Sequence, residues 1–207
     1  QSVVYAAEAG TPMVADPGFD LARAAVAEGY PLVSAPGPSA AVTALTLSGL
    51  PTDRFLFAGF LPATAGRRRK VLEELAAVPA TLIFYESPRR VAAMLEDAAK
   101  VLGGGRQAAL CREITKKFEE IRRDTLSGLA TQCAGTTLKG EIVVVIDRGD
   151  QSNVKETDLD SALEEALKEG SVRDAADLVA ARLGLPRRTV YQRALVLAAP
   201  GDRSDRD

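Results

Sequence analysis

The sequence predicts an α/β protein with two α/β domains and a small helical domain after them, and three observations lead to this prediction. Short apolar runs alternate with amphipathic segments of helical spacing over residues 2–147, which is typical of α/β layers. A polar stretch at residues 148–158, RGDQSNVKETD, has the composition of a linker. Three short helical patterns then close the chain.

The first part of the chain reads as strand, helix, strand and helix. The expected strands are SVVYA (2–6) and PLVSA (31–35), and the expected helices are 17–29 and 36–50. Pro38 is expected in the first turn of the second helix, where its missing N–H costs nothing. We assign residues 1–52 to the remainder of an N-terminal α/β domain with a parallel sheet.

A second α/β domain is expected over residues 53–148. Its predicted strands are 55–60, 80–87, 107–114, 118–126 and 140–147, and its predicted helices are 64–77, 88–102 and 127–133. The strand at 118–126 is expected to run antiparallel, which makes the sheet mixed.

The remaining divisions are a linker at 149–157, a helix-turn-helix-like domain at 158–199 and a disordered tail at 200–207. In the helical domain Ser171 is a suitable N-cap for the second helix, Gly184 breaks that helix and Pro186 opens the third. Two helices joined around Gly184 are typical of a helix-turn-helix.

Composition excludes several classes of function. The chain has 207 residues, 46% of them hydrophobic, and a formal net charge of −2, so bulk charge does not attract it to nucleic acid. It has no His, which excludes His-based triads and His metal sites. The thiols Cys111 and Cys133 fit no metal spacing and are expected to be reduced, as in a cytoplasmic protein. No metal site, signal peptide or membrane-spanning segment is expected.

Two loops are candidates for a ligand site. Glu8, Gly10 and Thr11 follow the first expected strand, and residues 36–40 follow the second. Ligands of open α/β sheets bind where strands end and helices begin, and glycine lets a backbone approach a ligand closely. Taken alone, both loops are also consistent with ordinary strand-to-helix turns rich in Gly and Pro, and local physics favours that interpretation. Neither is a phosphate loop.

Several motifs in order resemble one known family. They are EAGTPMVADPG (8–18), APGPSA (35–40), FAGFLP (57–62), FYESPRR (84–90), CREITKKFEE (111–120) and KGEIVVVI (139–146). Together they resemble the tetrapyrrole methylase superfamily, and most closely its RNA-modifying branch, the ribosomal RNA small subunit methyltransferase I type. The resemblance spans roughly residues 2–147. It implies two α/β domains with S-adenosylmethionine bound in the cleft between them.

The resemblance implies which residues hold the cofactor. They are Glu8, Ala9, Gly10, Thr11, Pro38, Ser39 and Ala40, with Phe60 and Leu61 flanking the adenine. The family usually has Asp at the position of Glu8. It also begins with a strand and a glycine-containing loop upstream of the first residue of this chain. Residues 1–207 alone are therefore expected to show little activity.

The implied reaction is methyl transfer from the sulfonium to the 2′-hydroxyl of a cytidine in 16S ribosomal RNA. The candidate catalytic residues are Arg112, Glu113, Thr115, Lys116 and Glu119. On an extended strand Arg112 and Lys116 would share one face, and Glu113 and Thr115 the other. The general base is left open between a carboxylate, a lysine of lowered pKa and water. A solvated, salt-bridged strand is the alternative for this segment.

Basic residues in three places are candidates for RNA contacts. They are Arg67, Arg68, Arg69, Arg89, Arg90, Arg187, Arg188 and Arg193. Arg89 and Arg90 are expected in the first turn of a helix, where cations oppose the helix dipole and so suggest a phosphate contact. Basic runs of this kind are also common on solvated helix faces.

The expected partners are the small ribosomal subunit with its 16S rRNA and a second copy in a homodimer, in the cytoplasm and away from membranes. Two other functions stay open. One is C-methylation of a tetrapyrrole or precorrin, which would have no use for a basic helical tail. The other is non-catalytic nucleic-acid binding on a degenerate methylase scaffold.

Overall fold

The computed structural model describes residues 2–35, 37–149, 156–168, 170–183, 185 and 187–198. The chain divides into two compact units, residues 1–149 and 150–207. Pro36, Gly184, Pro186 and the tail at 200–207 lie outside the described residues, as does most of the predicted linker. The predicted division at residue 52 stays a prediction.

A five-stranded mixed sheet forms the first unit, as predicted. Its strands are β1 (Phe55–Phe60), β2 (Thr81–Glu86), β3 (Gln107–Arg112), β4 (Glu120–Thr125) and β5 (Ile142–Ile146). Their order is β1-β2-β5-β3-β4. β1 runs parallel to β2, and all the other pairs are antiparallel. β5 has an all-apolar sequence because it lies in the middle of the sheet and is buried on both faces.

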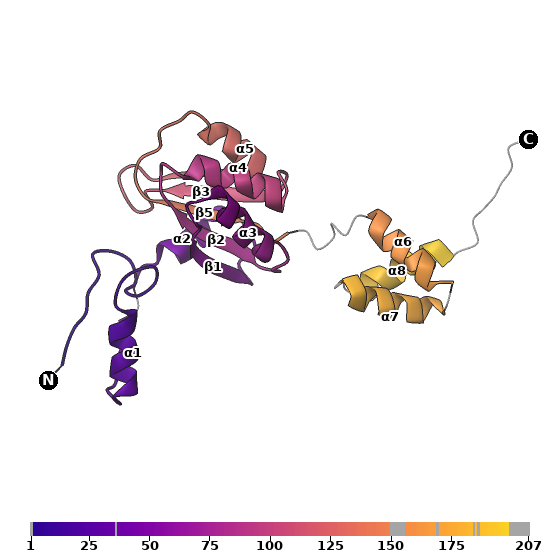
Figure 1. The fold of residues 1–207 in the computed structure, drawn as a ribbon, viewed down its shortest axis with the longest axis horizontal. Coiled ribbons are helices and arrows are strands. Elements are labelled where there is room, and N and C mark those ends of the chain that lie inside the picture. Colours follow the sequence, from indigo (N-terminus) through magenta and orange to yellow (C-terminus); the bar gives the residue numbers. More distant parts are fainter. Residues whose placement is uncertain are drawn as a thin grey trace, which may run out of the picture. The chain divides into compact units, whose positions relative to one another are not determined.

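Helices cover both faces of this sheet (Figure 1). α3 (Ala65–Ala76), α4 (Val91–Leu102) and α5 (Leu126–Cys133) pack on the face that carries Leu82, Phe84 and Val144. α2 (Ala40–Ser48) packs on the opposite face, where Ile83, Ala109 and Val145 alternate with the first set. This alternation along each strand is what gives the sheet two apolar faces.

A buried ion pair joins α3 to α4. Arg68 is only 5% exposed, and its Nε and NH2 groups lie 2.8 and 2.6 Å from Oδ2 of Asp97. NH1 of Arg68 donates to the Ala63 carbonyl at 3.0 Å. The prediction that Arg68 contacts RNA is therefore wrong: it lies on the same face of α3 as Leu72, which is also buried.

Residues 2–6 and 31–35, predicted as strands, form no strand. Val3, Val4 and Val33 are exposed. A strand is stable only when neighbouring strands satisfy its backbone groups, and the described residues place none beside these two runs. The helix between them does form as α1 (Phe19–Ala27), and it buries none of its side chains.

The second unit consists of α6 (Glu156–Ala166), α7 (Val172–Leu183) and α8 (Arg187–Ala198), in agreement with the three predicted helices. Leu163, Val179 and Val190 are completely or almost completely buried in its core. Ser171 precedes α7, and its hydroxyl accepts a hydrogen bond from the Asp174 amide at 3.2 Å, which confirms the predicted N-cap.

Both cysteines, Cys111 and Cys133, are buried free thiols. Burial raises the pKa of Cys111 to about 11. Within the described ranges, no helix has the length and hydropathy needed to span a membrane, and no three His, Cys, Asp or Glu side chains gather as metal ligands would.

The buried pair predicts a stability effect. Asp97→Asn leaves the Arg68 guanidinium buried without its counter-charge, which should lower the free energy of unfolding by about 3 kcal/mol. Arg69→Met, on the exposed face of the same helix, should change it by less than about 0.5 kcal/mol. Urea unfolding followed by circular dichroism measures both. Equal effects of the two variants would contradict the role given to the pair.

Candidate active site

The ends of the strands bring separate motifs to one edge of the sheet. Arg112 ends β3 and lies opposite Glu120, at the start of β4. It also lies opposite Ile142, at the start of β5. Ile142 in turn lies opposite Glu86, the last residue of β2. The segments FYESPRR, CREITKKFEE and KGEIVVVI therefore meet at this edge, which we call the motif edge.

Aromatic rings continue the motif edge onto β1. Phe60 pairs with Tyr85, and their ring centroids lie 5.8 Å apart. Phe57, also on β1, has its ring centroid 4.7 Å from that of Tyr85. The Leu61 side chain, predicted to flank adenine, is instead buried in the core, where it is shielded from any ligand. Tyr85 replaces it as a candidate, and only its position inside FYESPRR hinted at this.

The amino-terminal end of α2 lies beside the motif edge. Tyr85 packs against the apolar cluster that contains Ala41, which lies in the first turn of α2. At the other end of the helix, Arg123 donates two hydrogen bonds, of 3.0 and 2.6 Å, to the Leu47 carbonyl. Burial raises the pKa of Tyr85, and the nearby Ala41 backbone acts in the opposite direction. The helix is thus held at both ends with its first turn at the site.

One hydrogen bond joins the two predicted cofactor loops. Thr11 Oγ1 donates to the Pro38 carbonyl at 3.0 Å. Ser39 is the N-cap of α2, so Pro38 precedes the helix and does not lie in its first turn as predicted. Gly10 has a left-handed φ of 68°. Glu8, Ala9 and Gly10 are exposed, and Ala40 is half-buried.

Glu86 and Arg90 tie the motif edge to the β1–α3 turn. The Glu86 side chain is 1% exposed, and its Oε1 accepts the Ser87 amide at 2.8 Å. Its Oε2 lies 3.2 Å from Arg90 NH2, which also donates to the Leu61 carbonyl. Because α4 begins at Val91, Arg90 precedes the helix and does not lie in its first turn as predicted.

The segment after Arg112 turns back and does not continue as the extended strand that the sequence predicted. Glu113 and Thr115 have left-handed φ values of 49° and 65°. The Glu119 carboxylate accepts the Thr115 amide at 2.6 Å, which closes the turn. Alternation of faces, assumed in the prediction, therefore ends at Arg112. Residues 113–119 form the β3–β4 loop.

A charge cluster holds the β3–β4 loop against the start of β5. Glu113 Oε1 accepts the Glu141 amide at 2.9 Å and lies 3.1 Å from Lys116 Nζ. Lys116 Nζ also lies 3.1 Å from Glu141 Oε2. The hydrogen bond from the Glu141 amide, and then Lys116, lower the pKa of Glu113, while the two carboxylates raise the pKa of Lys116. Lys116 is therefore a cation and not a base of lowered pKa.

A second pairing lies next to this cluster. Arg112 Nε is 2.9 Å from one oxygen of Glu120, and Arg122 Nε is 2.7 Å from the other. Arg112 NH1 donates to the Lys139 carbonyl at 3.3 Å. The arginines lower the pKa of Glu120, with Arg122 as the larger cause. Glu120, Arg122 and Glu141 were not among the predicted site residues.

Gly140 makes this close approach possible. It has a φ of 90°, and a Cβ at this position would lie 2.3 Å from Cδ of Glu113. A side chain there would push Glu113 out of its hydrogen bonds. The glycine in KGEIVVVI is thus needed for the geometry of the site.

The predicted RNA-binding arginines fall into two groups. Four form ion pairs: Arg68, Arg90, Arg187 with Asp177, and Arg193 with Asp160. The other four are exposed and form no ion pair within the part of the chain that the structure describes: Arg67, Arg69, Arg89 and Arg188. The second group has charge free for phosphate.

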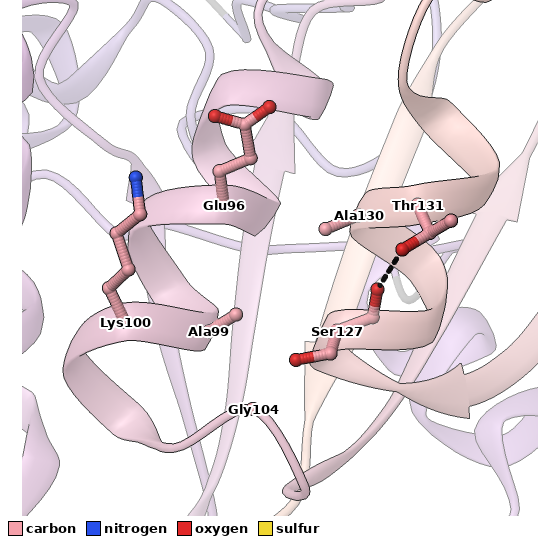
Figure 2. A pocket seen from close by; sticks show the side chains of 7 residues that line it. All are labelled: Glu96, Ala99, Lys100, Gly104, Ser127, Ala130 and Thr131. Carbon is pink, nitrogen blue, oxygen red and sulfur yellow. Dashed lines mark hydrogen bonds between the residues drawn. The ribbon is translucent and has the colours of Figure 1, made fainter.

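An open groove lies away from the motif edge, between α4 and α5. Figure 2 shows Ala99 on α4 opposite Ser127 on α5, with Gly104 below them, and Glu96, Lys100, Ala130 and Thr131 complete the lining. Thr131 Oγ1 donates to the Ser127 carbonyl at 2.9 Å. None of the predicted site residues lines this groove.

Comparison with known families decides the identity of the fold. The family model of Tetrapyrrole (Corrin/Porphyrin) Methylases matches residues 1–130. The chain belongs to the tetrapyrrole methylase family. A second model, the RsmI C-terminal HTH domain, matches residues 153–198 of this tetrapyrrole methylase.

Curated relatives of this tetrapyrrole methylase are ribosomal RNA small subunit methyltransferases I. The protein from Mesorhizobium japonicum is 46% identical over 206 residues, which cover 99% of this chain and 70% of the relative. The protein from Mycobacterium bovis is 43% identical over 196 residues, covering 94% of this chain and 68% of the relative. Within the tetrapyrrole methylases, the chain belongs to the family of these proteins.

The fold of the tetrapyrrole methylase chain also matches solved structures. The methyltransferase CobJ superposes with a TM-score of 0.50 at 21% identity, over 67% of this chain and 62% of CobJ. Diphthine synthase superposes with a TM-score of 0.50 at 18% identity, over 67% of this chain and 57% of that chain. These likenesses confirm the predicted fold class.

The close approach at Gly140 leads to a test. Gly140→Ala should lower the free energy of unfolding by about 1–3 kcal/mol through backbone strain alone, and by more through displacement of Glu113. Gly135→Ala is the control, because its φ of 68° is also left-handed but a Cβ there meets nothing within 4 Å. Urea unfolding compares the two. If Gly140→Ala costs no more than Gly135→Ala, the proposed contact does not constrain the loop.

The charge cluster predicts a pH dependence. Because the folded-state pKa of Glu113 lies below its ordinary value of 4.5, the ionised side chain stabilises the fold above that pH. This contribution is lost as pH falls through the lowered pKa. Glu113→Gln should thus be less stable than wild type at pH 7, with the difference shrinking as the pH falls below 4.5 and through the lowered pKa. Unfolding curves over a series of pH values measure this; a difference independent of pH would contradict it.

Proposed function

We propose that this chain transfers a methyl group from S-adenosylmethionine to the 2′-hydroxyl of a cytidine in 16S ribosomal RNA. The observation that carries the proposal is the 46% identity, along 99% of the chain, to a ribosomal RNA small subunit methyltransferase I. The convergence of the motifs at one sheet edge supports it, since it gives the shared segments a common place in the fold. The proposal includes the 2′-oxygen as the atom that is methylated and cytidine as the nucleotide that carries it.

The residues at the motif edge fit the cofactor. S-adenosylmethionine carries a flat base, ribose hydroxyls, a carboxylate and an activated methyl group. The exposed Phe60 ring beside Tyr85 offers a surface for the base. The first turn of α2, capped by Ser39, presents amides suited to a carboxylate. Glu8 offers an acceptor for hydroxyls, and the Thr11–Pro38 hydrogen bond holds the two loops together.

The chain's own groups then position the acceptor. The hydroxyl oxygen forms a bond to the methyl carbon as the carbon–sulfur bond breaks, and the hydroxyl proton leaves to a carboxylate or to water. Lys116, with its raised pKa, stays an ammonium and offsets part of the negative charge of Glu113 and Glu141. Glu113 stays ionised and holds Lys116 in place. We propose Glu113 and Glu119 as the carboxylates within reach of the acceptor, with Arg112 and Thr115 shaping their loop.

RNA is held, in this proposal, by the exposed arginines on both units. Arg67, Arg69 and Arg89 lie on the first unit and Arg188 on the second. Arginine contacts to phosphate position an RNA without reading its sequence. We also propose that the protein acts in the cytoplasm, where the small ribosomal subunits are, and that it does so as a homodimer.

Methyl transfer tests the proposal directly. The protein, expressed with any residues that its gene encodes before Gln1, is incubated with methyl-labelled S-adenosylmethionine and unmethylated small ribosomal subunits. A parallel reaction offers a corrinoid precursor. Label on a ribose of 16S RNA is expected. Label on the corrinoid would contradict the proposal. Binding of S-adenosylmethionine without transfer to either acceptor would contradict the choice of 16S RNA as the substrate.

Removal of one phosphate contact should weaken RNA binding in a salt-dependent way. Arg188→Ala should lower the slope of log affinity against log salt by about 1, because one cation fewer displaces counterions. Arg187→Ala is the matched control, since Arg187 is already paired with Asp177 and stacked on Tyr191. Filter binding to 16S RNA fragments at several salt concentrations measures both slopes. Equal slopes for wild type and Arg188→Ala would show that Arg188 does not contact the RNA phosphates.

A further inference from the structure

An exposed aromatic ring stands on the β3–β4 loop. Phe118 is 62% exposed, although phenylalanine is normally buried. The ammonium of Lys117 lies 5.6 Å from the centroid of its ring. Lys117 forms no ion pair with any residue that the structure describes. The loop therefore offers a flat apolar face and a free cation side by side.

The backbone that carries Phe118 is well held. The Lys116 amide donates to the Glu113 carbonyl at 2.9 Å, and the Glu119 amide donates to the Lys116 carbonyl at 3.1 Å. The Glu119 carboxylate accepts the Thr115 amide, and Ile114 packs against the apolar cluster under α2. Phe118 is thus exposed on a loop whose backbone is held by hydrogen bonds. Exposure of its ring gives up the stabilisation that burial of the ring in another loop conformation would provide.

The β3–β4 loop also places Phe118 close to the proposed catalytic residues. Phe118 precedes Glu120, which faces Arg112 across the first pair of the β3–β4 ladder. It is therefore part of the motif edge, next to the proposed catalytic residues. An aromatic ring here would meet a nucleotide close to the acceptor ribose.

We infer that Phe118 is a stacking platform for an unpaired base of the RNA substrate, with Lys117 binding the adjoining phosphate. This inference rests on the proposed function and adds a positioning contact to it. Proteins that bind unpaired RNA stack bases on aromatic rings and flank these rings with cations, as found here. Every base has a π-face, so the contact places the nucleotide without selecting its sequence.

Binding of a short single-stranded RNA that carries one 2-aminopurine tests the inference, because stacking quenches the fluorescence of this base. Phe118→Leu keeps an apolar side chain and removes the π-face. It should weaken binding by roughly 5- to 150-fold and abolish the quenching. Phe118→Tyr should restore both. Lys117→Gln should keep the quenching and lower the salt slope by about 1.

Phe19 provides a matched control on the same chain. It is 64% exposed, and the guanidinium of Arg23 lies 5.6 Å from the centroid of its ring, but it lies on α1. Phe19→Leu should leave RNA binding and quenching unchanged. Circular dichroism confirms that each variant is folded.

The outcomes separate the inference from the proposed function. Wild-type binding that is unchanged in Phe118→Leu, or lost equally in Phe19→Leu, would overturn the platform alone. Wild type that binds S-adenosylmethionine but no RNA would overturn both the platform and the RNA substrate. Selective loss in Phe118→Leu, with rescue by Phe118→Tyr, is the result that the structure leads us to expect.

Discussion

The register of β5 is the constraint on which the site depends. Ile142 faces Glu86 on one side and Arg112 on the other, so one central strand aligns the ends of β2 and β3. A shift of one residue would exchange the apolar faces of β5 and separate the two motifs. Burial of the whole strand opposes such a shift, because each face is matched to its own helical layer. The same register of β5 is therefore required both to pack the core and to assemble the site.

Most of the charged residues at the motif edge form ion pairs with one another. Glu113, Lys116 and Glu141 form one cluster, and Arg112, Glu120 and Arg122 form another. Exposed pairs of this kind contribute little to stability one at a time. Their effect here is geometric, since they hold a loop with two left-handed residues in one conformation. Such a loop is suited to chemistry in which the donor is already activated and the protein mainly positions the acceptor.

Local patterns predicted most of the fold. The strands from β1 to β5 and the eight described helices, α1 to α8, lie where the local patterns of the sequence predicted them. The strands expected at 2–6 and 31–35 depend on partners elsewhere, which local pattern does not report. The motifs that carry the family resemblance include the three segments that meet at the motif edge, but their meeting was not predicted. Nor did the motifs predict that Glu113 and Thr115 take left-handed conformations, because neither residue type favours them.

The basic residues show a similar limit. GRRRK reads as a charged run, yet Arg68 shares a helix face with Leu72 and Leu75, a spacing that could have marked it as buried. Its partner Asp97 lies between Met94 and Ala98, which are also buried. Which arginines are free for RNA therefore depends on tertiary pairing. Sequence spacing alone did not separate Arg187 from Arg188.

We propose that the motif edge, beside the first turn of α2, is the methyl-transfer site. A crystal structure of the protein with bound S-adenosylhomocysteine would locate the methyl donor. We expect the ligand against Thr11, Ser39 and Tyr85, with the β3–β4 loop beside its sulfur. Ligand density in the groove between α4 and α5, or at the Leu47 end of α2, would show that methyl transfer takes place elsewhere.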